Sequence, residues 1–197
     1  MHISDGVLSL EMTIVVSAIS FLFLVKAVKK LKDEEISLTA VASAMFFIAS
    51  FIHIPFGVTQ VHLILLGVIG ILISWSSFVA IFVALLLQAL LLGYGGIASL
   101  GVNLFVMAIP AIIVSYLYKT TFMKQLNDKL KYFLVGFIGT FFATLFLTMI
   151  LYFSKDEYNY AALTIFSVNI ITMIIEGIVS MFLLLFIKKV YPKILKD

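Results

Sequence analysis

The chain alternates long apolar runs with short polar stretches, and this pattern predicts helices that cross a membrane. A spanning helix needs about 20 mostly apolar residues, and fewer where neighbouring helices shield it. Only Ser74, Trp75 and Ser76 separate the third run from the fourth, so six spans with one long hairpin is the competing count. We favour seven spans, at roughly residues 9–31, 36–53, 60–74, 76–93, 100–119, 131–153 and 164–189.

The composition supports a membrane protein. Hydrophobic residues make up 63% and charged residues 12% of the chain, whereas soluble domains average about 45–50% and about 25%. A water-soluble fold could not bury that much apolar surface, but lipid chains solvate apolar side chains directly. No proline-, serine- or glycine-rich linker divides the 197 residues. We therefore expect an all-α membrane protein with a single integral domain over residues 1–197.

The lysines predict how the chain is oriented. There is no arginine, so the thirteen lysines carry all of the fixed positive charge. Seven spans place Lys155 on one side of the membrane and the other twelve on the opposite side. Because positively charged connections stay in the cytoplasm, we expect the amino terminus outside and the carboxyl terminus in the cytoplasm. The twelve are Lys26, Lys29, Lys30, Lys32, Lys119, Lys124, Lys129, Lys131, Lys188, Lys189, Lys193 and Lys196.

The same sequence argues against nucleic-acid binding and against cysteine chemistry. The lysines flank the spans without a basic-aromatic binding pattern, which argues against nucleic-acid binding. The absence of cysteine excludes disulfides, thiolate metal sites and cysteine nucleophiles.

The first residues lack the positive charge with which a secretory signal begins, and no clear cleavage site follows the first run. We therefore expect Met1 to be the mature amino terminus.

The histidines offer candidate metal ligands. All three, His2, His53 and His62, lie at or beside the first two predicted outer segments, 1–8 and 54–59. A free Met1 amine, the His2 amide nitrogen and the His2 imidazole can close a five-membered and a six-membered chelate ring around one ion. A second imidazole would complete a planar set of four nitrogens, which favours Ni(II) or Cu(II) and accommodates Co(II), whereas zinc prefers a tetrahedron. Spacing alone leaves open that His2 is simply a polar residue on a frayed terminus.

Each remaining candidate also has a structural alternative. His62 and His53 could be interfacial residues, and His53, just before Pro55, fits that role better. Glu176 is the only acid well inside a predicted span, where a carboxylate is a functional candidate; bonding to neighbouring helices is the alternative that we favour. The glycine-rich stretch 88–96 lacks the lysine and hydroxyl of a phosphate loop, so its glycines more simply allow close backbone approach.

Taken together, these segments resemble the CbiM/NikM family, the substrate-capturing components of energy-coupling-factor (ECF) transporters for cobalt and nickel. The resemblance begins at residues 1–9 (MHISDGVLS) and continues at 55–63 (PFGVTQVHL), where the family typically has Gly-Gly-Thr-Ser-x-His-Leu. It continues at 88–97 (QALLLGYGGI) and 100–107 (LGVNLFVM), with a weaker echo at 175–177 (IEG). Val58 and Gln60 depart from the usual glycine and serine.

The resemblance implies a fold, a ligand set and partners. The fold would be an extra amino-terminal helix ahead of a six-helix core. The Met1 amine, the His2 amide and imidazole, and the imidazole of His62 would hold the metal, with no resident cofactor. His53 stands where the family more often has asparagine or another polar residue, so we do not assign it as a ligand.

The partners implied are a membrane coupling (T) subunit, two ATPase subunits and often a small accessory membrane protein, in a prokaryotic cell (inner) membrane. Ala40 and Ala44, four residues apart on the second span, would dock on the coupling subunit; small residues at this spacing allow close helix contact.

The sequence thus predicts a binding component that captures extracellular Ni²⁺ or Co²⁺ for uptake and has no enzymatic activity of its own. ATP hydrolysis would belong to the partners, because the chain has no phosphate loop. The alternative is a self-sufficient divalent-metal channel or secondary carrier. That class normally has several ionisable residues along its path, and here Glu176 stands alone. The sequence contains no catalytic constellation that would indicate an intramembrane enzyme. The same ligands suit Ni²⁺ and Co²⁺, so both ions remain candidates.

Overall fold

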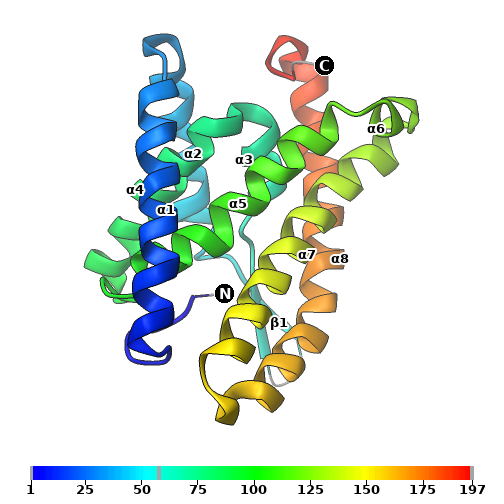
Figure 1. Cartoon of the computed structure of the whole chain (residues 1–197). Helices are drawn as coiled ribbons and strands as arrows, with labels where there is room; N and C mark the ends of the chain where they lie inside the picture. The colour runs from blue at the N-terminus through cyan, green and yellow to red at the C-terminus, as the bar shows by residue number, and fades with distance from the viewer. Residues whose placement is uncertain (1, 57–58, 196–197) are drawn as a thin grey trace.

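The computed structural model describes residues 2–56 and 59–195 of the chain, which form a helical bundle with one short β-hairpin (Figure 1). The strands are β1 (His53–Phe56) and β2 (Thr59–His62). Single 3₁₀ turns are η1 (Ser74–Ser76), η2 (Asp156–Tyr158) and η3 (Pro192–Ile194). The helices are α1 (Leu10–Lys30), α2 (Asp33–Ala49), α3 (Leu66–Ile73), α4 (Ser77–Leu92), α5 (Leu100–Tyr118), α6 (Thr121–Gln125), α7 (Asp128–Ser154) and α8 (Asn159–Val190).

The all-α membrane architecture predicted from the sequence is confirmed. In the described part of the chain, five helical segments are long and apolar enough to cross a membrane: Leu10–Lys30, Leu66–Leu92, Leu100–Tyr118, Asp128–Ser154 and Asp156–Val190. Helix α2 is slightly shorter, at 17 residues. In Figure 1, α7 and α8 form a long antiparallel pair on one side, α1, α2 and α4 gather on the other, and α5 runs between them.

The predicted third span, residues 60–74, is not a continuous helix. Its first residues form β2, which pairs antiparallel with β1, and His62 lies opposite His53 in the register. The helix begins only at Leu66, after Leu65 adopts a left-handed conformation at φ 52°. An apolar run of this length cannot be assigned to helix or strand by periodicity, and here the pairing with β1 satisfies the backbone instead.

Helix α3 lies at the centre of the bundle because it is apolar on every face. Six of its eight residues are buried. Gly67 packs directly against the carbonyl oxygen of Val135 in α7, and Gly70 packs against that of Ala111 in α5. A side chain at either glycine would collide with backbone, so these two residues set how closely α3 approaches its neighbours.

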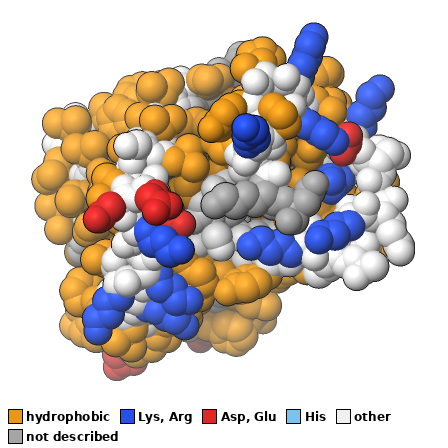
Figure 2. Space-filling view, turned by 90° about the horizontal axis from the view of Figure 1, so that it is seen from above, with side chains coloured by type: hydrophobic (Ala, Val, Ile, Leu, Met, Phe, Trp, Pro, Cys, Tyr) orange, Lys and Arg blue, Asp and Glu red, His pale blue; other side chains and the backbone are white. Residues whose placement is uncertain are grey.

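The described lysine side chains, apart from that of Lys155, gather at one end of the bundle, which Figure 2 shows from above. This is the end where α1, α5 and α8 finish, while Lys155 follows α7 at the opposite end (Figure 1). Trp75 lies at the lysine-rich end, with the ammonium groups of Lys26 and Lys30 each 4.5 Å from its ring centre. The grouping matches the one that the sequence predicts, whereas the side of the membrane that it faces stays a prediction.

Candidate metal centre

The residues before α1 enter the interior of the bundle, where a buried side chain holds them. The backbone amide of Ile3 donates to Oδ1 of Asn103 at 2.8 Å, and Nδ2 of Asn103 donates back to the Ile3 carbonyl at 2.9 Å. Only 4% of Ile3 and 2% of Asn103 is exposed. This two-way bond from α5 fixes the backbone directly after His2.

A second anchor acts through Asp5. Its amide donates to the carbonyl of Gly95 at 3.0 Å, and its carboxylate accepts from the amide and hydroxyl of Ser99, the residue before α5, at 2.8 and 2.6 Å. These bonds lower the pKa of Asp5, and the bond from the Ser99 hydroxyl has the largest effect. The negative charge of Asp5 is also favourable at the amino terminus of α5. Gly96 has φ 122°, and a Cβ there would collide with the Asp5 carboxylate. The amino-terminal segment and the glycine-rich stretch therefore fit each other.

These anchors present His2 to a small group of polar side chains. Nε2 of His2 lies 2.9 Å from Oε1 of Gln88 in α4. The ring of His2 is nearly parallel to that of His62, with ring centres 5.7 Å apart and 25° between the planes. The ring centre of Tyr94 lies 6.0 Å from that of His2. Burial, and next the positive charge of the amino terminus, lower the pKa of His2 to about 4. His2 is therefore neutral at neutral pH, in the form that binds metal ions.

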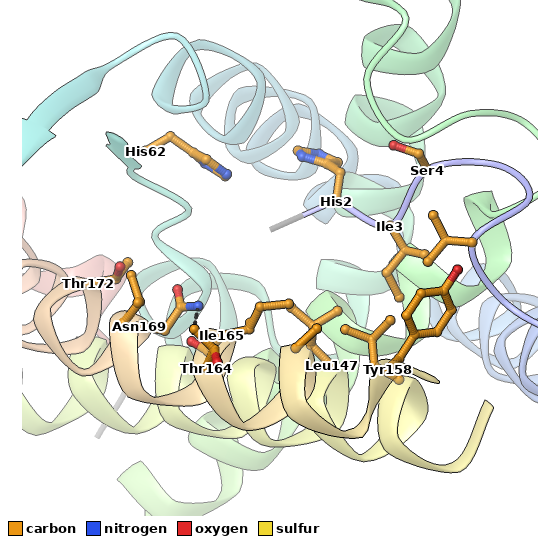
Figure 3. Close-up of a pocket in the computed structure, with 14 residues that line it drawn as sticks. His2, Ile3, Ser4, His62, Leu147, Tyr158, Thr164, Ile165, Asn169 and Thr172 are labelled. Atoms are coloured by element: carbon orange, nitrogen blue, oxygen red, sulfur yellow. Dashed lines mark hydrogen bonds between the residues drawn. The ribbon is translucent and has the colours of Figure 1, made fainter. Parts of the chain in front are cut away.

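His62 reaches the same place from the end of β2, and Figure 3 shows the two imidazoles pointing toward one another. Metal–imidazole bonds are about 2 Å long, so rings at this separation can bind one ion between them. Across the described residues, no three His, Asp or Glu side chains gather at one point.

Glu176 holds the chain just beyond His62. The fully buried carboxylate accepts from the amide of Ile64, and from the amide of Leu65 at 3.1 Å. It thus bridges α8 to the junction between β2 and α3, two residues from a candidate ligand. This contact fits the alternative favoured from the sequence, a carboxylate that bonds to neighbouring segments.

Two cavities border the histidine pair. The smaller, about 320 Å³, lies among His2, Ser50, His62 and the glycine-rich stretch. The larger, about 560 Å³, opens between the amino-terminal segment and the α7–α8 pair, where Thr164, Asn169 and Thr172 of α8 face it (Figure 3). Both histidines line both cavities, so an ion between the rings would be reachable from either side.

The other predicted site residues lie in different places. Met1 lies outside the described residues, and of His53 only the backbone is described, opposite His62. Ala40 and Ala44 are exposed on α2 and line neither of these cavities. Gln88 and Asn103 are contacts of the amino-terminal segment that the sequence analysis does not predict; the signal that could identify them is a polar residue within an otherwise apolar span.

The chain is similar to known metal transport proteins. Residues 2–194 match the sequence model of CbiM, described as the cobalt uptake substrate-specific transmembrane region. The chain is 35% identical to a putative metal transport protein of Haemophilus influenzae, and the match covers 99% of this chain and 97% of that protein. It is 31% identical over 149 residues to a putative fused nickel transport protein, NikMN, of Archaeoglobus fulgidus, of which the match covers 50%. A crystal structure of a truncated transition metal transporter has a TM-score of 0.80 and 26% identity, over 96% of this chain and 99% of the other.

Proposed function

The chain belongs to the CbiM/NikM family and is a multi-pass membrane protein of cobalt and nickel transport, and from this premise we propose that it captures external Ni²⁺ or Co²⁺ for import. The observation that carries the proposal is the facing pair of imidazoles, with ring centres 5.7 Å apart, beside an anchored amino-terminal segment. His2, which its lowered pKa leaves neutral, and His62 lie at the junction of two cavities and offer an ion a binding position with access from both sides.

The ligand set that we propose has four nitrogens. The Met1 amine, the His2 amide and the His2 imidazole form fused chelate rings, and His62 supplies the fourth donor. The chelate is planar because its rings share the amide nitrogen, and a planar set favours Ni(II) and accommodates Co(II). Zinc, which prefers a tetrahedral arrangement, is disfavoured. Binding releases protons from the amine and the amide, so the affinity rises with pH.

The capture component works in this proposal with an ECF membrane coupling subunit, two ATPase subunits and an accessory membrane protein. The face of α2 that carries Ala40 and Ala44 supports such docking, because the neighbouring Ile36, Val41 and Ile48 are 51–64% exposed along the same helix. Small residues at this spacing allow another helix to approach closely. The lysine-rich end faces the cytoplasm, and the amino-terminal segment faces outward.

The experiment that tests the site blocks the amine. Calorimetric titration of the purified protein with Ni²⁺ and Co²⁺ is compared between protein with a free Met1 amine and protein in which that amine is acetylated, after mass spectrometry has established each amino terminus. We expect acetylation to abolish high-affinity binding, since the acetylated nitrogen no longer offers the lone pair of an amine. Unchanged affinity would remove the amine from the ligand set, and a wild type that binds neither ion would overturn the capture function.

A further inference from the structure

A directional chain of hydrogen bonds runs from His2 into the bundle. Nε2 of His2 lies 2.9 Å from Oε1 of Gln88, whose Nε2 donates to the hydroxyl of Ser50 at 2.9 Å. The Ser50 hydroxyl in turn donates to the carbonyl of Phe47 at 2.7 Å. Gln88 is completely buried, and 3% of Ser50 is exposed. These hydrogen bonds link the amino-terminal segment to α4 and to the end of α2.

The carbonyl of Phe47, the last group in this series of hydrogen bonds, determines the direction of every bond in it. A carbonyl oxygen can only accept, so the single hydroxyl proton of Ser50 is directed at Phe47. Ser50 therefore accepts from Gln88, which places the amide nitrogen of Gln88 toward Ser50 and its oxygen toward His2. An amide oxygen cannot donate, so in neutral His2 the proton lies on Nε2 and Nδ1 carries the lone pair.

This tautomer is the one that an amino-terminal chelate requires. From the His2 amide nitrogen, the path through Cα, Cβ and Cγ reaches Nδ1 and closes a six-membered ring with the ion. The path to Nε2 is longer, and Nε2 lies on the far side of the imidazole. Only Nδ1 can bind the same ion as the amide.

We propose that Gln88 and Ser50 are positioning residues that hold the His2 imidazole in its Nε2-protonated tautomer and orientation, with Nδ1 directed to the transported ion. The proposal rests on the proposed function. A hydrogen-bond acceptor on the second nitrogen of a ligating imidazole fixes the tautomer and the ring orientation and increases the basicity of the donor, and its loss typically lowers metal affinity about 10- to 100-fold.

The pairing also accounts for a polar residue in an apolar helix. Gln88 carries the one amide side chain among the sixteen residues of α4. Burying an amide without hydrogen-bond partners is costly. Here the Gln88 oxygen and nitrogen each have one partner, and the oxygen's partner is the candidate ligand.

The test measures the tautomer and the affinity separately. Protein labelled with ¹⁵N-histidine is examined by NMR without metal, where Nε2-protonated His2 gives distinct shifts for its two ring nitrogens. The variants are Gln88→Leu, which removes the acceptor, Gln88→Glu, which keeps only acceptors, and Ser50→Ala, which lets the Gln88 amide turn over. Ser115→Ala is the matched control, because it removes a buried hydroxyl bonded to Ser74 at 2.9 Å, away from His2.

We expect the wild type and Gln88→Glu to show the Nε2-protonated form, and Gln88→Leu and Ser50→Ala to show a mixture of tautomers. Calorimetry with Ni²⁺ should give an affinity about 10- to 100-fold lower for Gln88→Leu, an intermediate loss for Ser50→Ala, and no change for Ser115→Ala. If Gln88→Leu does not fold, Ser50→Ala decides. Wild-type tautomer and affinity in every folded variant would overturn the proposal, whereas a wild type that fails to bind Ni²⁺ would overturn the proposed function itself.

Discussion

At the scale of single residues, the candidate ligands differ in how replaceable they are. In the proposed site His62 would contribute one donor from the end of β2, and no other described imidazole faces His2. We predict that His62→Ala lowers Ni²⁺ affinity at least about tenfold, or about 1.4 kcal/mol. His53→Ala should change it less than about twofold, since the family resemblance gives His53 no ligand role. Calorimetry on both variants checks this, and equal losses would make His53 a ligand.

His2 also makes the stability of the metal-free protein depend on pH. Its pKa is lowered from 6.5 to about 4 in the folded protein, so between these values the unfolded chain binds more protons than the folded one. Stability therefore rises with pH through this window and falls as the pH drops toward 4, by at most about 1.4 kcal/mol per pH unit. Melting temperatures of wild type and His2→Ala between pH 4 and 7 measure the difference. Identical pH profiles would contradict the prediction.

Among the elements, α8 contacts the segment that directly follows His62. Glu176 accepts the amides of Ile64 and Leu65 at the point where β2 gives way to α3. We predict that Glu176→Ala leaves those amides unsatisfied, destabilises the protein by about 1–3 kcal/mol and lowers Ni²⁺ affinity. Ser180→Ala, one turn further along α8, is the control, because its buried hydroxyl has no hydrogen-bond partner among the described residues. Thermal unfolding and calorimetry measure both effects, and equal behaviour of the two variants would remove the anchoring role.

The elements also show how far the sequence could predict the fold. The long helices follow from apolar runs that match the thickness of a bilayer. The β-hairpin and the short α3 do not, since a short apolar run is compatible with strand or helix. The partner of Glu176 could not be predicted either, because it lies 112 residues away along the chain. His2 and His62 could be proposed from chelate geometry and resemblance, whereas Gln88 and Asn103 acquire a role only once the amino-terminal segment is seen between α4 and α5.

At the scale of the whole molecule, the orientation in the membrane can be tested directly, because the chain contains no cysteine. Gln125 in α6 and Glu157 in η2 are exposed near opposite ends of the bundle (Figure 1). We predict that Glu157→Cys reacts with a membrane-impermeant maleimide in intact cells and that Gln125→Cys reacts only after permeabilisation. The opposite labelling pattern would place the lysine-rich end outside and contradict the positive-inside assignment.

The proposed docking face on α2 allows metal capture to be tested separately from transport. Ala40 and Ala44 are exposed on α2 and line neither cavity beside His2 and His62, so bulk there should leave the ligands undisturbed. We predict that Ala40→Trp with Ala44→Trp keeps Ni²⁺ affinity but abolishes nickel uptake by cells and co-purification with the coupling subunit, because two indoles prevent close helix contact. Ala18→Trp places one indole on an exposed alanine of α1 and should preserve all three. Uptake that survives in the double variant would mean that transport does not proceed through this face, and uptake by the purified chain alone in liposomes would instead support a self-sufficient carrier.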